Sequence, residues 1–393
     1  MKRDNVFDKH PLILMILLLV IILFATDIIG KNVFKYYYKV QYKKNNHEKE
    51  YRIPSNYYHH DLKPNVSIPK NSWGIISAPV ATNSLGFKDR QPRKISPSPD
   101  HYRILFIGDS FTEGVGISYE KTFVGIIDNE LHKKNIEVLN AAVVSYSPSI
   151  YYAKVKYLID FVGLHFDELV VFIDISDIGN EAIEYRLDGD RVVEREKDLK
   201  IKYDERNEKY IDLLKKRRTV YQKVEQILKR DTVMTYNIVK KIHDIFFSRD
   251  YSYDYDSVNL RGALWTTDKS IYDEFGKAGL DESAKNMDLL ANLCRNKRIT
   301  LTIAVYPWPD QIVRHDLNSI QSQFWKNWAK KHDVKFIDYF PYFISSNINA
   351  ASVRSTLDSY FIAGDIHWNS EGHKKIADIF LHNYRPSHLK TAE

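Results

Sequence analysis

The sequence is nearly without cysteine and carries no strong charge of one sign. Cys294 is the single cysteine among 393 residues, which excludes an intrachain disulfide and any Cys-x-x-Cys pair for zinc or redox chemistry. We expect it to be a buried free thiol. The net charge is +6, from 57 basic and 51 acidic residues, and it gives no reason to infer a nucleic-acid partner.

Several common motifs are also missing. The sequence contains neither a G-x-x-x-x-G-K phosphate loop nor a G-x-S-x-G nucleophile elbow, which argues against a P-loop nucleotide site and an α/β-hydrolase. No internal repeat or low-complexity tract is present. We expect no cofactor, and no residue cluster predicts a metal site.

The longest apolar run lies near the N-terminus, at residues 11–30. Its apolar centre extends from Leu12 to Ala25, and Ile28 and Ile29 bring it close to the length of a tilted membrane helix. A cleaved signal peptide is the alternative, but no clear small-x-small cleavage site follows. The sequence therefore predicts a membrane anchor at residues 1–30, followed by a Lys- and Tyr-rich stalk at 31–65.

From residue 66 to 393 the pattern is that of one α/β domain. Apolar strand-like runs, such as that of residues 102–107, alternate with helical periodicity, which predicts a doubly wound parallel sheet. Such sheets bind ligands at the carboxyl ends of their strands. Residues 180–260 interrupt the alternation with mixed charges and an apolar stripe, which predicts an inserted helical subdomain with a solvated face. The stripe consists of Ile211, Leu214, Val220, Val224 and Leu228.

Two short stretches predict nucleophilic catalysis. Ser110 follows the first buried strand in a Gly-Asp-Ser turn, and Asp365 and His367 stand two apart near the C-terminus, before a helix that Asn369 or Ser370 can cap. A serine hydroxyl needs a base, and the base needs an orienting group. Each stretch alone is commonly structural. Together they predict that Ser110, His367 and Asp365 meet at one edge of the sheet.

This combination resembles the SGNH, or GDSL, hydrolase family of esterases and acyltransferases. The first family block is similar to "GDSFTEG" and the last to "GDIHWN", whose Asp-x-His-Trp form resembles that of polysaccharide O-acetyltransferases such as the alginate acetylation proteins. "TNSLGFKD", residues 82–89, resembles the lead-in of membrane-attached members. The resemblance covers residues 80–178 and 295–385 and implies a flavodoxin-like sheet, with Ser110 as nucleophile and Asp365 and His367 as its partners.

The middle blocks depart from the family pattern. Ser145 stands where the family has a glycine whose backbone N–H joins the oxyanion hole, and Ser176 stands where it has an asparagine. The expected oxyanion donors are the N–H groups of Ser110 and Ser145 and the Ser176 hydroxyl. Losing one such donor costs about 3 to 4 kcal/mol of transition-state stabilisation.

The resemblance thus implies a membrane-anchored, serine-dependent ester hydrolase or O-acyltransferase acting on cell-envelope carbohydrate or a small ester. A catalytically weak or inactive scaffold of a polysaccharide assembly is the alternative. Lysines follow the apolar run, and the positive-inside rule alone would place the domain in the cytoplasm. An envelope substrate requires an extracytoplasmic domain, which is the predicted location.

Five further side chains carry expectations of their own. His59 and His60 are expected to form a hydrogen-bonded surface pair, or to border the site if the stalk folds back over it. Trp308 and Trp368 either stack on a sugar or pack in the core. Asp109 is expected to cap the turn and the helix that follow it.

Overall fold

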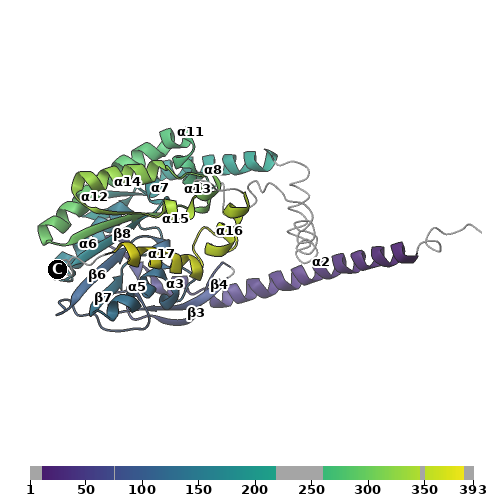
Figure 1. Cartoon of the computed structure of the whole chain (residues 1–393), viewed down its shortest axis with the longest axis horizontal. Coiled ribbons are helices and arrows are strands. Elements are labelled where there is room, and N and C mark those ends of the chain that lie inside the picture. Colours follow the sequence, from purple (N-terminus) through teal and green to yellow (C-terminus); the bar gives the residue numbers. More distant parts are fainter. Residues whose placement is uncertain (1–10, 75, 218–259, 346–349, 385–393) are drawn as a thin grey trace, which may run out of the picture. The chain divides into compact units, whose positions relative to one another are not determined.

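The computed structural model describes residues 11–74, 76–217, 260–345 and 350–384 (Figure 1). It divides into two units. The first, residues 1–45 and 208–250, contains helix α2 (Pro11–Asn45). Within the described ranges, no helix has both the length and the hydropathy needed to cross a membrane. The anchor predicted at residues 1–30 therefore finds no support.

The second unit, residues 46–207 and 251–393, is built on an eight-stranded sheet. Five strands run parallel, in the spatial order β7, β6, β8, β11 and β12. When the five parallel strands are numbered by their order along the chain, their order in space is 2-1-3-4-5, which is a doubly wound order. The α/β prediction is confirmed. The bounds are β6 (Tyr102–Ile107), β7 (Ile136–Asn140), β8 (Glu168–Ile173), β11 (Thr300–Val305) and β12 (Lys335–Asp338).

Helices cover both faces of this sheet, as its continuously apolar central strands require. Helices α5 (Phe123–His132) and α17 (Ser370–Asn383) pack together on one face. Helices α6 (Pro148–Asp160), α12 (Lys277–Lys297) and α14 (Ile320–His332) lie on the other (Figure 1). Further helical elements lie between the strands and these helices: α4 (Ser110–Glu113), η1 (Tyr119–Lys121), η2 (Arg261–Thr266), α11 (Lys269–Ile271), η3 (Tyr272–Gly276), α13 (Pro309–Val313), α15 (Phe340–Phe343) and α16 (Ala350–Tyr360).

The segment predicted as a stalk, residues 31–65, is organised differently. Its first part continues α2 to Asn45. The rest forms α3 (Glu48–Tyr51) and an antiparallel hairpin of β1 (Arg52–Ser55) and β2 (His59–Leu62). The hairpin folds onto the domain because Asp61 forms a buried ion pair with Lys154 of α6, with 2.7 Å between Oδ1 and Nζ. The polar composition of this stretch thus reflects paired groups as well as solvated ones.

Three antiparallel strands extend the sheet beyond β7. They are β5 (Lys88–Asp89), β4 (Ile76–Thr82) and β3 (Ser67–Trp73), in that order outward. Strand β3 ends at Trp73, which lies beside the candidate site described below.

The predicted insertion at residues 180–260 is only partly helical where it is described. Helix α7 (Asp177–Ile183) leads into a hairpin of β9 (Tyr185–Asp188) and β10 (Arg191–Glu194), and α8 (Lys197–Arg217) follows. Ile211 of the predicted stripe is exposed on α8. Val220, Val224 and Leu228 lie outside the described residues.

Candidate active site

Ser110 lies just beyond the carboxyl end of β6, at the first position of α4. Strand β6 has β7 on one side and β8 on the other, so Ser110 is at the point where the strand order reverses, the usual ligand site of such sheets. Gly108 allows the tight exit from the strand, since a Cβ there would lie 2.3 Å from Thr112 Oγ1. Asp109 caps α4 by accepting the Phe111 N–H at 3.0 Å, as predicted.

The three residues predicted to meet do meet. The distance between His367 Nε2 and Ser110 Oγ is 2.8 Å, and that between His367 Nδ1 and Asp365 Oδ1 is 2.6 Å. Ser110 is 8% exposed and His367 is 7% exposed. Because the ionised Asp365 accepts a hydrogen bond from the Nδ1–H group, the lone pair of Nε2 faces the serine hydroxyl. The arrangement can therefore remove the Ser110 proton.

A compact turn holds Asp365 and His367 in place. The Ile362 N–H donates to the His367 carbonyl at 2.9 Å, and Phe361 pairs with Trp368 as an isolated β-bridge. Asn369 then caps α17 by accepting the N–H groups of its first turn, which confirms one of the two predicted caps. The turn and the helix cap fix the register of the Asp-x-His pair relative to Ser110.

Trp73 completes the carboxylate's hydrogen bonds and was not singled out from the sequence. Its indole N–H donates to Asp365 Oδ2 at 3.0 Å, and its ring meets the His367 ring edge-on at 5.4 Å between centroids. Burial favours a higher pKa for Asp365. The hydrogen bonds from His367, its charge and the hydrogen bond from Trp73 outweigh burial, so that the pKa of Asp365 is lowered. Asp365 is therefore held ionised. A lone tryptophan on an outer strand carries no sequence signal that marks it.

Three buried carboxyl groups lie behind the serine. Asp109, Asp174 and Asp177 place one oxygen each within 4.8 Å of one another. Burial, together with the charge of Asp174, raises the pKa of both Asp109 and Asp177, which favours their protonated forms. Asp109 Oδ2 is 3.2 Å from Ser110 Oγ. A neutral Asp109 leaves the imidazole as the stronger acceptor for the serine proton.

The predicted oxyanion donors have different surroundings. Ser110 N–H belongs to the first turn of α4, where N–H groups have no intrahelical acceptor. Ser145 has a φ of +62°, the left-handed conformation that suits the glycine expected there. The Ser176 hydroxyl lies 2.5 Å from Asp174 Oδ1, so its single proton is used within its own turn. Asn180, on α7, donates to the Ser145 carbonyl at 3.4 Å and supplies a nearby amide that the sequence did not single out.

The two tryptophans considered for sugar stacking are buried. Trp368 is fully buried, and Trp308 is 6% exposed and donates its indole N–H to Asp174 Oδ2 at 2.7 Å. Both therefore pack in the core, which is the other predicted role. Cys294 is a buried free thiol, as expected.

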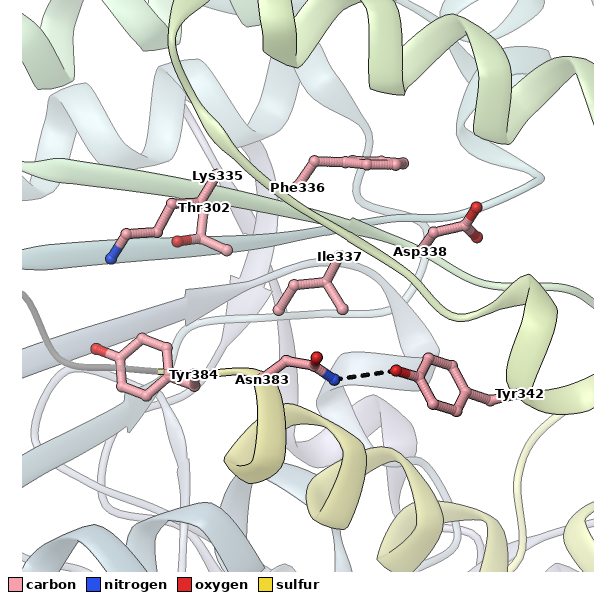
Figure 2. Close-up of a pocket in the computed structure, with 8 residues that line it drawn as sticks. All are labelled: Thr302, Lys335, Phe336, Ile337, Asp338, Tyr342, Asn383 and Tyr384. Atoms are coloured by element: carbon pink, nitrogen blue, oxygen red, sulfur yellow. Dashed lines mark hydrogen bonds between the residues drawn. The ribbon is translucent and has the colours of Figure 1, made fainter.

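A separate cavity of about 440 Å³ lies beside the edge strand β12. Figure 2 shows it between β12 and the end of α17, with the Asn383 amide donating to Tyr342 Oη at 3.2 Å. Its lining contains none of Ser110, His367 and Asp365. The lining residues are Thr302, Lys335, Phe336, Ile337, Asp338, Tyr342, Asn383 and Tyr384.

Comparison with known proteins finds similarity at the level of structure. No family model matches the sequence, and no curated protein matches it. Solved structures of G-D-S-L lipolytic proteins, esterases and acylhydrolases are similar to it. A lipolytic protein of the G-D-S-L family from Veillonella parvula is 14% identical, with 72% of this chain and 98% of that chain covered and a TM-score of 0.34.

Two further structures are similar to the same extent. The acetylxylan esterase Axe2 from Geobacillus stearothermophilus is 13% identical over 73% of this chain and 95% of its own, with a TM-score of 0.36. An acylhydrolase described as putative from Bacteroides fragilis is 12% identical over 76% and 92%, with a TM-score of 0.34. All three TM-scores are below 0.5, so the chemistry proposed below rests on this chain's own residues.

Proposed function

We propose that the protein is a serine-dependent enzyme of acyl esters that uses Ser110 as its nucleophile. The observation that carries the proposal is the hydrogen-bonded series Asp365–His367–Ser110, with distances of 2.6 and 2.8 Å. His367 Nε2 takes the serine proton as Oγ attacks the ester carbonyl, and Asp365 stabilises the imidazolium. The imidazolium then protonates the leaving alcohol, and an acyl-enzyme remains.

The negative charge of the tetrahedral intermediate requires N–H donors. We propose the backbone N–H groups of Ser110 and Ser145 for this role. The commitment of the Ser176 hydroxyl to Asp174 Oδ1 makes the predicted third donor weaker than an asparagine amide would be.

The acyl acceptor decides between two outcomes of the same chemistry. Attack by water on the acyl-enzyme gives an ester hydrolase, and attack by a sugar hydroxyl gives an O-acyltransferase. We propose cell-envelope carbohydrate as the substrate class, on the strength of the resemblance of "GDIHWN" to polysaccharide O-acetyltransferases. Incubation with an acetylated oligosaccharide, with and without an unacetylated acceptor, separates free acetate from transferred acetyl groups by mass spectrometry.

Two variants and one probe test the nucleophile. Ser110→Ala and His367→Ala should abolish turnover of 4-nitrophenyl acetate while circular dichroism stays unchanged, and a fluorophosphonate should label Ser110 alone. Undiminished turnover in either variant would refute the assignment. A folded protein that the probe does not label would favour the second candidate, a catalytically inactive scaffold, for which the serines at positions 145 and 176 argue.

The location of the domain stays a prediction from the sequence. Alkaline phosphatase fused after residue 60 should be active if that part of the chain is extracytoplasmic. A stable but inactive fusion would place it in the cytoplasm.

A further inference from the structure

The hairpin of β1 and β2 contacts the turn that carries one of the proposed oxyanion donors. This turn, residues 143–146, follows β7 and is closed by the Tyr146 N–H, which donates to the Val143 carbonyl at 3.2 Å. His60 Nε2 lies 2.7 Å from the Val144 carbonyl oxygen. The Val144 N–H donates to Glu113 Oε2 at 2.8 Å, and Glu113 is paired with Arg52. The hairpin thus holds Val144 directly at its carbonyl and, through Glu113, at its N–H.

The direction of one peptide group follows from these contacts. The Val144–Ser145 peptide is planar and trans, so its N–H points opposite to its C=O. Since the C=O is directed at His60, the Ser145 N–H is directed away from the hairpin. Two helices contact the groups on either side of this peptide: Glu113 of α4 accepts from the Val144 N–H, and Asn180 of α7 donates to the Ser145 carbonyl.

This orientation is one that a serine does not favour by itself. The positive φ of Ser145, at the third position of the turn, is that of a type II turn, in which glycine is preferred. A type I turn has the central peptide turned over and a negative φ at the third position, which suits any residue with a Cβ. Without an external contact, the turn would therefore be expected to shift toward type I and carry the Ser145 N–H away from its site.

We propose that His60 is a positioning residue that keeps the Val144–Ser145 peptide turned so that the Ser145 N–H serves the oxyanion site. The inference rests on the proposed ester chemistry at Ser110. A carbonyl can only accept, so His60 must carry its proton on Nε2. Its Nδ1 then accepts from Nδ1 of His59, 2.8 Å away.

The surroundings of His60 keep it in this form. Its ring packs against Tyr146 at 5.0 Å between centroids, and the Tyr146 hydroxyl donates to the His60 carbonyl at 2.7 Å. Burial lowers the pKa of His60 to about 4, although the hydrogen bond to the Val144 carbonyl opposes this shift. The ring is therefore neutral at pH 7, and the single proton stays on the nitrogen that faces Val144.

Steady-state kinetics of the full chain with 4-nitrophenyl acetate test the proposal. His60→Ala should lower kcat about tenfold or more with KM changed less than about threefold, because an oxyanion donor acts mainly in the transition state. His60→Gln should restore most of kcat, since its amide can reach Val144, whereas the shorter His60→Asn should not. His165→Ala, at an exposed histidine of the same domain, is the control and should leave kcat unchanged.

A second substitution distinguishes positioning from general damage. Ser145→Gly removes the cost of the positive φ, so the loss caused by His60→Ala should shrink to within about threefold when both changes are combined. An unchanged kcat in His60→Ala, or an equal loss with and without Ser145→Gly, would overturn the proposal. If His60→Ala does not fold, the comparison of His60→Gln with His60→Asn decides. Wild-type protein without turnover or labelling would instead refute the proposed function, and this inference with it.

Discussion

Replacing Asp365 by asparagine keeps the size of the side chain but turns one acceptor oxygen into an NH₂ donor. The carboxylate accepts from His367 Nδ1 and from the His367 backbone N–H on Oδ1, at 2.6 and 3.1 Å, and from Trp73 on Oδ2 at 3.0 Å. An amide has a single acceptor oxygen, so it can accept from His367 or from Trp73 but not from both. With its carbonyl toward His367, the NH₂ opposes the Trp73 N–H. With its carbonyl toward Trp73, the NH₂ faces His367 and favours the tautomer that cannot accept the serine proton.

These contacts set the expected magnitudes. Losing the carboxylate of a Ser-His-Asp triad lowers kcat by about 10⁴. An unsatisfied buried donor costs about 1 to 3 kcal/mol, and in Asp365→Asn this cost falls on the productive amide orientation. Trp73→Phe removes the opposing N–H and with it the penalty. The double variant should therefore be about tenfold more active than Asp365→Asn alone. In the protein that keeps Asp365, Trp73→Phe should instead lower activity.

The assay is kcat/KM for 4-nitrophenyl acetate at neutral pH for the four proteins of this cycle. Trp328→Phe is the matched control, because its indole N–H also donates to an aspartate, Asp288 Oδ1 at 2.7 Å, but between α14 and α12. It should give no recovery when combined with Asp365→Asn. A double variant at Asp365 and Trp73 whose kcat/KM is no higher than that of Asp365→Asn alone would refute the reasoning.

Two further predictions concern stability. A Cβ on Gly279 would lie 2.0 Å from a carbonyl oxygen of α7, whereas one on Gly179 would meet its nearest neighbour at 3.7 Å; Gly279→Ala should therefore cost about 2 kcal/mol in urea unfolding, and Gly179→Ala should not destabilise. Arg52→Met should lower the free energy of unfolding by about 3 kcal/mol at neutral pH, because Glu113 stays buried without its cation. Burial favours a higher pKa for Glu113, but Arg52 outweighs it and the pKa is lowered. The stabilisation is thus complete above the unfolded pKa of about 4.3 and is lost as pH falls through the folded value. The deficit of the variant should accordingly shrink below about pH 5, and an equal deficit at every pH would contradict the assignment.

The sequence was sufficient where one local pattern dictates one structure. The run Ile104–Ile107 is fully buried in β6, as an uninterrupted apolar strand predicts. The Asp-x-His pair came together with Ser110 across 257 residues, because the turn that precedes α17 lies at the carboxyl end of β6, where Ser110 stands. This prediction needed only the residue types, the place of the serine after the first strand and the place of the Asp-x-His pair before the last helix.

The hairpin at residues 52–62 was not predictable in the same way. Its polar side chains resemble those of a solvated stalk until their partners are known, and Lys154 lies 93 residues beyond Asp61. The sequence does not distinguish a charged residue that is buried in an ion pair from one that is exposed to water. Composition therefore could not separate a stalk from a segment that folds against the domain.

The proposed oxyanion site shows a third limit. Serine at positions 145 and 176 is visible in the sequence, but the φ of Ser145 and the acceptor of the Ser176 hydroxyl depend on the turns that carry them. Trp73 raises the same difficulty, because its role depends on how an outer strand ends next to a loop formed 292 residues later.

The wide separation of Ser110 from its base has a consequence for biosynthesis. At a translation rate of about 5 to 20 residues per second, roughly 13 to 50 s pass between the synthesis of the two residues. Throughout that interval the nascent chain holds a serine with no base to activate it. A ribosome-bound intermediate should thus be unreactive toward a fluorophosphonate, and acquisition of labelling would report that the last segment has docked.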